Sequence, residues 1–242
     1  MSPRCTQGDA TSPEVWVRAL EGRRADVLLS DPPYCLLTRR RKAGDLRDPK
    51  HKKIDRGPVR RFENVREFRD FTKRWLELAV PHLAPDAPMV LWMNLLGREP
   101  MIAACRELGY GHVRGEFVWG KRTREGNSGE EILRVVETAL VICRTAAPPQ
   151  SPDSPALPWA AVAGYDDDGE AAKWGSHPNH KPFGVLEPLV RTWSRPGQLI
   201  VDPFAGSGSI PAAAVRLGRD VAAIELEAEW AETVNRRLSP SG

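Results

Sequence analysis

The chain has 242 residues, 41% of them hydrophobic and 28% charged, which is typical of a soluble globular protein and enough for one large domain with a buried core. No apolar run approaches the roughly 18 residues of a transmembrane helix, and the N-terminal segment lacks the apolar core of a signal peptide, so we expect a cytoplasmic protein with no membrane partner. The net charge at pH 7 is only +3, but it is unevenly spread.

The first half of the chain predicts two buried strands and two helices. Residues 25–30 form an almost unbroken apolar run, which is typical of a strand buried on both faces of a parallel sheet. From Asn64, a suitable N-cap, to Leu83, apolar residues recur every three or four positions and predict an amphipathic helix. Residues 87–95 predict a second buried strand, and residues 99–108 predict a helix closed by Gly109.

The second half predicts further strands and helices in alternation. Strands are expected at 113–119 and 135–143, with the polar stretch 121–131 between them, and a proline-rich loop at 145–158. A helix over 184–193 precedes a βαβα unit, whose members are a strand at 198–202, a helix at 209–218, a strand at 220–225 and a helix at 227–238. This alternation predicts a single-domain α/β fold with a mostly parallel, Rossmann-like sheet.

A basic block follows the first strand. Between Leu37 and Arg61 there are eleven Lys or Arg residues against three Asp, so this segment carries +8 and the remaining chain −5. Such a block is typical of a polyanion-binding surface, although a solvated loop is the alternative. Its position directly after Asp31-Pro32-Pro33-Tyr34 favours nucleic acid. The candidate nucleic-acid-binding residues are Arg39, Arg40, Arg41, Lys42, Lys50, Lys52, Lys53 and, further along the chain, Lys121.

The cysteines and histidines indicate no metal centre. The four cysteines are widely scattered without a Cys-x-x-Cys pair, which favours reduced, buried thiols over a zinc site or a disulfide framework; they are Cys5, Cys35, Cys105 and Cys143. His177 and His180 lie close together, but no acidic or cysteine residue stands at ligand spacing from them. We therefore expect no metal.

A glycine-rich turn follows the strand at 198–202. Gly206 and Gly208 permit a tight turn against which a ligand can lie, and Glu225 ends the next strand, where an acid can accept hydrogen bonds from a ribose. A nicotinamide dinucleotide would favour a third glycine where this chain has Pro211, and Asp202 would repel its pyrophosphate. An acid there suits an ammonium group, so S-adenosylmethionine fits better than a nicotinamide cofactor. The turn contributes Asp202, Phe204, Ala205, Gly206, Ser207 and Gly208 as candidate cofactor-binding residues.

The other motif, Asp31-Pro32-Pro33-Tyr34, suits an exocyclic amino group. Pro32 and Pro33 fix φ and remove two N–H donors, so Asp31 and the Pro32 carbonyl can accept the two amino hydrogens while Tyr34 stacks on the ring. Such an amine is a poor nucleophile, and orientation of the reactants can supply about 7–11 kcal/mol. Asp31 is interpreted as an acceptor and orienter; a turn with a buried tyrosine is the structural alternative.

These motifs together resemble the S-adenosylmethionine-dependent amino-methyltransferases of DNA, in the β-group order in which the catalytic motif precedes the cofactor motif. The resemblance covers nearly the whole chain. Asp31–Tyr34 is similar to the catalytic motif, Asp202–Gly208 to the cofactor loop and Ala223–Leu226 to the ribose-binding strand end. Three further matches are His177–Pro182, which resembles the segment that wraps the cofactor, Gly8-Asp9, whose acid would lie near the adenine, and Phe117–Lys121, which resembles the W-x-K strand.

The resemblance implies one methyltransferase domain over residues 1–242, with a circularly permuted motif order. Residues 36–61 would be a basic target loop, and residues 121–176 the target-recognition region. It adds Asp9, His177, Lys181, Pro182 and Glu225 to the expected S-adenosylmethionine-binding residues, and it implies that the target base is rotated out of double-stranded DNA.

Asp at the first motif position favours adenine N6 as the methylated atom, with cytosine N4 as the first alternative. An RNA adenine methyltransferase would use the same amino-group chemistry. A nucleotide-dependent oxidoreductase and a non-catalytic DNA-binding protein on a decayed methyltransferase scaffold are the rival functions from different classes. The sequence leaves open whether the protein forms a homodimer and whether a cognate restriction endonuclease accompanies it.

Overall fold

The structure is a computed structural model that describes residues 3–37, 60–124, 130–146, 160–162, 169, 173–174 and 180–239. In chain order its elements are β1 (Arg4–Gln7), α1 (Pro13–Leu20), β2 (Val27–Ser30), α2 (Val65–Ala79), η2 (Val80–His82), β3 (Met89–Met93), η3 (Leu95–Gly97), α3 (Arg98–Glu107), β4 (His112–Arg124), β5 (Glu130–Cys143), β6 (Ala160–Val162), α5 (Phe183–Trp193), β7 (Leu199–Asp202), α6 (Ser209–Arg216), β8 (Asp220–Glu225) and α7 (Ala228–Leu238).

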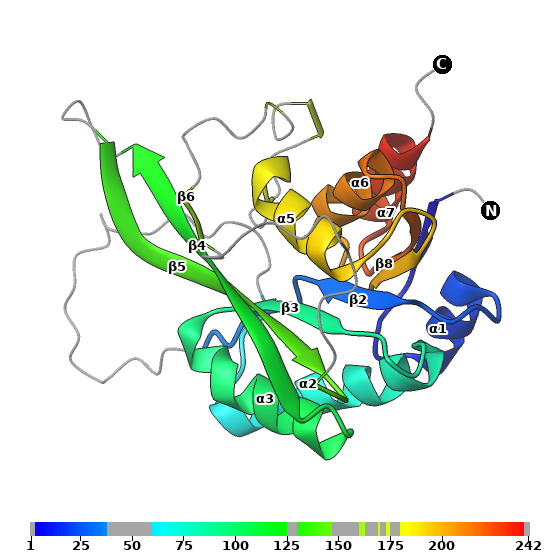
Figure 1. The fold of residues 1–242 in the computed structure, drawn as a ribbon, viewed down its shortest axis with the longest axis horizontal. Helices are drawn as coiled ribbons and strands as arrows, with labels where there is room; N and C mark the ends of the chain where they lie inside the picture. The colour runs from blue at the N-terminus through cyan, green and yellow to red at the C-terminus, as the bar shows by residue number, and fades with distance from the viewer. Residues whose placement is uncertain are drawn as a thin grey trace.

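One sheet organises the molecule (Figure 1). Its strand order is β1-β8-β7-β2-β3-β5-β4-β6. Five neighbouring strands run parallel to one another, namely β1, β8, β7, β2 and β3. Strand β5 is antiparallel to both β3 and β4, and β6 is parallel to β4. The predicted α/β class with a mostly parallel sheet is therefore confirmed. Because β2, β7 and β8 are parallel neighbours, their carboxyl ends meet at one edge, where open α/β sheets bind ligands.

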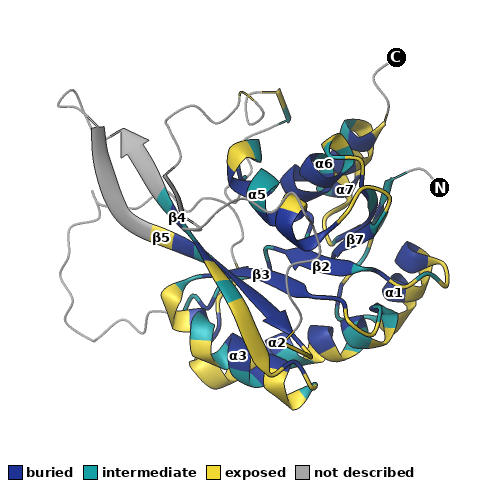
Figure 2. Ribbon diagram, viewed as in Figure 1, coloured by how far each residue is buried: buried dark blue, intermediate teal, exposed yellow. Residues whose placement is uncertain are grey.

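Helices cover both faces of the sheet. Figure 1 shows α2 and α3 on one side and α5, α6 and α7 on the other. The alternation of side chains along the strands explains the two cores: Leu28 of β2 packs into the core that contains α1, α2 and α3, whereas Val27 and Leu29 pack into the core that contains α5, α6 and α7. The central strands are accordingly buried on both faces, as Figure 2 shows.

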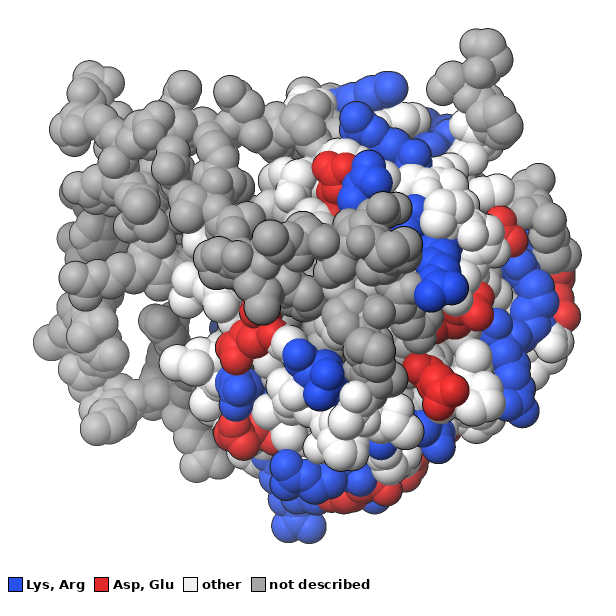
Figure 3. Space-filling view, viewed as in Figure 1, with Lys and Arg blue, Asp and Glu red and all other residues white. Residues whose placement is uncertain are grey.

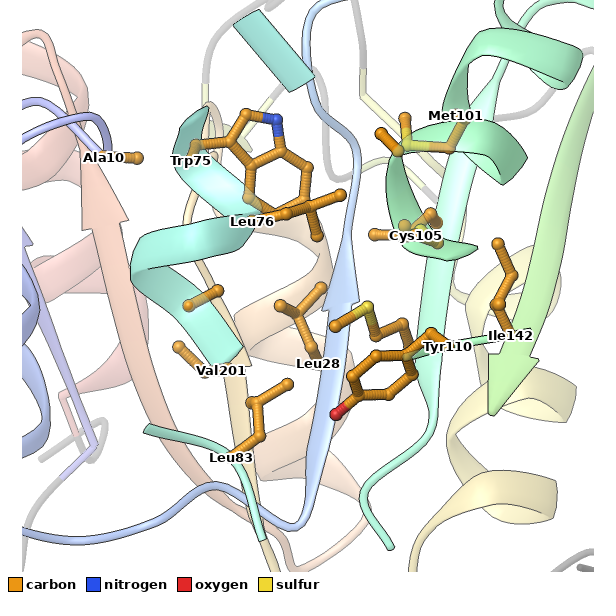
Figure 4. Packing of buried hydrophobic residues seen from close by; sticks show 14 of the residues in the cluster. Ala10, Leu28, Trp75, Leu76, Leu83, Met101, Cys105, Tyr110, Ile142 and Val201 are labelled. Carbon is orange, nitrogen blue, oxygen red and sulfur yellow. The ribbon is translucent and has the colours of Figure 1, made fainter. Parts of the chain in front are cut away.

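The first of these cores is closely packed. Figure 4 shows Trp75 and Leu76 of α2, Met101 and Cys105 of α3 and Leu28 of β2 converging between the helices and the sheet. Each of these side chains is at most 1% exposed. Burial of this kind stabilises the fold by roughly 1.5–3 kcal/mol for each large apolar side chain.

Local signals explain the helix boundaries. The Asn64 side chain accepts a hydrogen bond from the Glu67 N–H at 3.0 Å, so the expected N-cap of α2 is confirmed. Gly109 adopts φ +85° just after α3, as expected of a closing glycine. Pro211 lies in the first turn of α6, where a missing N–H costs no intrahelical hydrogen bond.

The structure also differs from the sequence-based expectations. Strand β1 and helix α1 were not predicted, because each is short and β1 has no apolar period; β1 is defined by its pairing with β8. The polar stretch 121–131 was wrongly expected to separate two shorter strands. Instead, β4 continues into this stretch as far as Arg124, and β5 already begins within it at Glu130. Cross-strand hydrogen bonds, which the polarity of a side chain does not prevent, extend this hairpin.

Several predicted features lie outside the described residues. They are most of the basic target loop 36–61, the greater part of the region 121–176 with its proline-rich loop, and His177. On the face shown in Figure 3, the described residues mix basic and acidic side chains rather than presenting a single sign of charge. Within the described parts of the chain, no helix combines the length and the apolar character needed to cross a membrane. All four cysteines are buried free thiols, as predicted.

Candidate active site

The Asp31-Pro32-Pro33-Tyr34 corner begins directly after β2. This strand lies in the middle of the sheet, between β7 and β3, so the corner stands at the carboxyl edge beside the glycine-rich turn. The Asp31 side chain is 9% exposed, and its Oδ1 atom is buried with no hydrogen-bond partner in the described structure. An amino group could therefore donate to Oδ1.

The second oxygen of Asp31 accepts a hydrogen bond from a lysine that lies 150 residues further along the chain. Lys181 Nζ lies 2.6 Å from Asp31 Oδ2, 3.0 Å from Glu137 Oε2 and 3.3 Å from the Tyr34 hydroxyl. The Tyr34 hydroxyl in turn donates to Glu137 Oε2 at 2.9 Å. We call these four residues the buried charge cluster. The Lys181 and Glu137 side chains are only 1% and 8% exposed.

The cluster alters the protonation of its members. Burial raises the pKa of the Asp31 carboxyl, the adjacent Lys181 ammonium opposes that rise, and Glu137 adds to it. Burial alone would lower the pKa of Lys181, but Asp31 and Glu137 raise it by more, so the ammonium stays charged. Burial and the same two carboxylates hold the pKa of Tyr34 well above its ordinary value, so its hydroxyl remains a donor.

The glycine-rich turn connects β7 to α6. Gly206 and Gly208 have φ of +51° and +79°, the left-handed region that glycine adopts without strain. The Gly206 N–H donates to Glu225 Oε2 at 2.7 Å, so the turn is attached to the end of β8. The Phe204 ring packs edge-on against Trp75 with centroids 5.2 Å apart, while Ala205 and Ser207 are buried.

Asp202 is the buried acid at the start of this turn. Its Oδ1 atom accepts hydrogen bonds from Ser30 Oγ at 2.7 Å and from the Phe204 N–H at 3.2 Å, whereas Oδ2 is buried without a partner in the described structure. Burial is the main cause that raises the pKa of Asp202 to about 7. A cation placed against Oδ2 would favour the ionised form.

Glu225 and Asp9 lie at neighbouring strand ends. The Gly8 N–H donates to the Glu225 carbonyl at 2.8 Å, which extends the pairing of β1 with β8. Asp9 follows at once and accepts hydrogen bonds from the Thr11 N–H and hydroxyl, both at 2.8 Å. Burial raises the pKa of Glu225. Next to it, Leu226 is an exposed apolar residue, 59% accessible, that could contact a flat ring.

Comparison with known proteins decides the family. A family model described as DNA methylase, of the N6/N4 class, matches residues 25–236. The chain belongs to the N6/N4 DNA methylase family. The protein is therefore a DNA amino-methyltransferase that uses S-adenosylmethionine, and the resemblance drawn from its motifs is confirmed.

Individual relatives agree with this assignment. The type II methyltransferase M2.DpnII of Streptococcus pneumoniae is 25% identical over 235 residues, which are 88% of this chain and 82% of that protein. The structure of M1.HpyAVI with S-adenosylmethionine has a TM-score of 0.69 at 17% identity, covering 98% of this chain and 99% of the other. The cytosine-N4-specific PvuII DNA methyltransferase has a TM-score of 0.67 at 16% identity, covering 99% and 90%. These two structures show that the fold is shared.

The residues of this methylase fit S-adenosylmethionine. That molecule carries an ammonium, a ribose diol and an adenine ring. The unpartnered Oδ2 atom of Asp202 is a buried acceptor of the kind an ammonium requires. Glu225 accepts a hydrogen bond from the Gly206 N–H of the same turn. Because residue 206 is a glycine, it adopts a left-handed φ without strain and has no side chain to fill the space where a ligand would lie.

The methylase brings together most, but not all, of the predicted site residues. Asp31, Tyr34, Asp202 and Glu225 lie at the same sheet edge, with Asp9 beside Glu225. Lys181 was expected to bind the cofactor, but its ammonium contacts Asp31 and Glu137, while Pro182 forms the N-cap of α5. The residues predicted to bind DNA, from Arg39 to Lys53 and the side chain of Lys121, lie outside the described residues, as does His177.

Sequence reasoning missed Glu137. The residue lies in β5 within the run Val135 to Cys143, which is apolar except for Glu137 and Thr138, and an acid in such a run is a sign of a buried charge with a partner. Trp92 of β3 was also not connected to the site, whereas Trp119 of β4 belongs to the W-x-K strand that the family resemblance placed beside the target pocket. Their ring centroids lie 4.7 and 5.7 Å from Lys181 Nζ, so both indole rings make cation–π contacts with the ammonium.

Proposed function

We propose that this methyltransferase methylates N6 of adenine in double-stranded DNA. The observation that carries the proposal is Asp31 itself: a buried carboxylate whose Oδ1 atom has no hydrogen-bond partner in the described structure, next to the tyrosine of the same corner. Asp at this motif position favours adenine over cytosine among similar enzymes. The target base would leave the stack, because its amino group cannot be reached inside the duplex.

The cofactor would be held by acids at three strand ends. Asp202 would accept a hydrogen bond from the methionine ammonium, Glu225 would accept from the ribose hydroxyls, and Asp9 would lie near the adenine. When bound, S-adenosylmethionine supplies a methyl group on a positively charged sulfur. The turn from Ala205 to Gly208 would lie against the ligand, and its attachment to Glu225 keeps both parts in one arrangement.

Asp31 would act by orienting the amino nitrogen of the base. A carboxylate that accepts one amino hydrogen draws the nitrogen lone pair out of conjugation with the ring, and the nitrogen then becomes a better nucleophile. Tyr34 would stack on the base. As the nitrogen forms its bond to the methyl carbon, the bond from that carbon to the cofactor sulfur would break and leave a neutral thioether. The methylated nitrogen would then carry one proton too many, and this proton would leave for solvent. Positioning, rather than proton removal before attack, would supply much of the rate.

The test is direct identification of the modified nucleoside. DNA from cells that express the chain, and from cells that express Asp31→Ala, is digested to nucleosides and analysed by mass spectrometry. The proposal predicts N6-methyladenine that depends on Asp31. N4-methylcytosine would contradict the choice of base, and methylated nucleosides found in RNA alone would contradict DNA as substrate. Sequencing of the methylated positions would then report the recognition sequence.

The type II naming of M2.DpnII supports a role in restriction and modification. We propose that this chain also protects a specific DNA sequence from a cognate endonuclease. Plasmid DNA from expressing cells should then resist one restriction activity of the source organism. Complete cleavage of that DNA by every endonuclease of the organism would contradict this role.

A further inference from the structure

We propose that Lys181 and Glu137 are positioning residues for Asp31: the lysine ammonium holds Oδ2, the glutamate holds the ammonium, and Oδ1 is thereby presented to the amino group of the target base. This inference deepens the proposed function, since it rests on the proposed role of Asp31. It also gives Lys181 a different role from the cofactor binding expected from its motif.

The hydrogen-bond geometry of Lys181 supports this role. An ammonium has three N–H donors, and here they are directed to Asp31 Oδ2, Glu137 Oε2 and the Tyr34 oxygen at 2.6, 3.0 and 3.3 Å. Tyr34 completes a closed ring by donating to Glu137. With all its donors engaged, the ammonium fixes the rotation of the Asp31 carboxylate, and the two oxygens of that carboxylate become inequivalent.

The surroundings of the ammonium keep it in place. Lys181 is 1% exposed, and the indole ring of Trp92 lies 4.7 Å from Nζ. A buried ammonium that lost its carboxylates would remain desolvated and unpaired, which is strongly unfavourable. The Lys181 side chain therefore cannot leave Asp31 and Glu137 without a large rearrangement, and Asp31 Oδ2 stays occupied while a base binds.

The charges in the cluster give Lys181 and Glu137 opposite effects on Asp31. The groups that face Asp31 are Lys181 from the segment before α5, Glu137 from β5, Tyr34 from its own corner and Asp202 from β7. Lys181 favours the ionised carboxylate, whereas Glu137 disfavours it. Loss of the lysine charge should therefore make Asp31 harder to ionise, and loss of the glutamate charge should make it easier.

The experiment measures methyl transfer as a function of pH. Single-turnover rates are determined from about pH 5 to pH 9 for the wild type, Lys181→Met, Lys181→Arg and Glu137→Gln, with radiolabelled S-adenosylmethionine and DNA both saturating. Glu116→Gln on β4 is the control, since this exposed acid pairs with Arg98 away from the cluster. Cofactor affinity and thermal unfolding are recorded for each variant.

Two opposite shifts are expected. The acid limb of the rate profile should move to higher pH by about 1–3 pH units in Lys181→Met, and to lower pH in Glu137→Gln. Lys181→Arg should return the limb toward its wild-type position, and Glu116→Gln should not move it. The rate of Lys181→Met at pH 7 should fall about 100-fold, because the Asp31 carboxylate is no longer held in position.

Several results would overturn the proposal. If the rate fell equally at every pH in Lys181→Met and in Glu137→Gln, both residues would serve only to pack the site. If the sole defect of Lys181→Met were weaker binding of S-adenosylmethionine, Lys181 would be a cofactor-binding residue, as its motif predicted. If Lys181→Met does not fold, the nearly isosteric Glu137→Gln decides: an unmoved or raised acid limb refutes the proposal. The radiolabel counts methyl groups on either base, so an error in the proposed base would leave this test intact, whereas full activity of Asp31→Ala would refute the proposed function itself.

Discussion

Ser30 Oγ donates a hydrogen bond of 2.7 Å to Asp202 Oδ1, and both residues are almost completely buried. Ser30 ends β2 and directly precedes Asp31, whereas Asp202 ends β7 and begins the glycine-rich turn. Residues 172 positions apart thus connect the strand that carries the Asp31–Tyr34 corner to the strand that carries the glycine-rich turn. The two motifs belong to one site because β2 and β7 are neighbours in the sheet.

Cofactor binding should depend on pH through Asp202. Its pKa is raised to about 7, so the carboxyl is mostly neutral at pH 5.5 and about half ionised at pH 7. The methionine ammonium prefers the ionised form, and the affinity for S-adenosylmethionine should increase by about 10-fold between these pH values. Isothermal titration calorimetry measures this directly.

Two variants test that assignment. Asp202→Asn should bind the cofactor weakly and with little pH dependence. Ser30→Ala removes a hydrogen bond that lowers the pKa of Asp202, so the rise in affinity should move to higher pH. An unchanged pH dependence in Asp202→Asn would assign the effect to another group.

Asp31 should matter for catalysis and little for cofactor binding. Asp31→Ala removes the acceptor for the target amino group, and methyl transfer at saturating substrate should fall at least about 100-fold, while the cofactor dissociation constant changes by less than about threefold. Asp31→Asn is the matched variant, since it keeps the shape of the side chain without its charge. Wild-type rates in both variants would contradict an orienting role for this carboxylate.

Gly208 should be sensitive to any side chain. Its φ of +79° strains other residues, and a Cβ there would lie 3.0 Å from Val234 Cγ2. Gly197 is a matched control, because its φ is +82° but a Cβ there would meet no atom within 4 Å. Gly208→Ala should lower the free energy of unfolding by about 2–4 kcal/mol and Gly197→Ala by about 1–2 kcal/mol. Urea denaturation measures both, and equal losses would show that the contact with Val234 relaxes freely.

The core between β2 and α2 should tolerate truncation poorly. Leu28 is fully buried, and Leu28→Ala should lower the free energy of unfolding by about 2–5 kcal/mol because it leaves a cavity. Val17 of α1 is 60% exposed, so Val17→Ala should change that free energy by at most about 0.5 kcal/mol. A loss below about 1 kcal/mol in Leu28→Ala would mean that the surrounding side chains in Figure 4 close the gap.

Much of the site was predictable because its signals are local. The strand before Asp31 is an apolar run, the turn at Gly206 and Gly208 needs glycine for its φ, and Glu225 follows a strand at a characteristic distance. Strand ends in a parallel sheet share one edge, so the position of each motif directly after a predicted strand was enough to expect Asp31 and Asp202 at the same edge, although the pairing of β2 with β7 is seen only in the structure. The start of α2 followed in the same way from the Asn64 cap, whereas its end was expected at Leu83 and lies at Ala79, where the 3-10 helix η2 with Pro81 takes over.

The partners of Asp31 could not be predicted, because they depend on contacts between distant segments. Lys181 is 150 residues from Asp31, and Glu137 reaches the site only because β5 runs antiparallel beside β3, which neighbours β2. By itself the sequence determined which strand ends bear acids, where the backbone turns and which family the chain belongs to, since these are written in short runs of residues. Only the tertiary structure decided which charge neutralises which, because the energy of a buried ion pair depends on distance and desolvation rather than on position in the sequence.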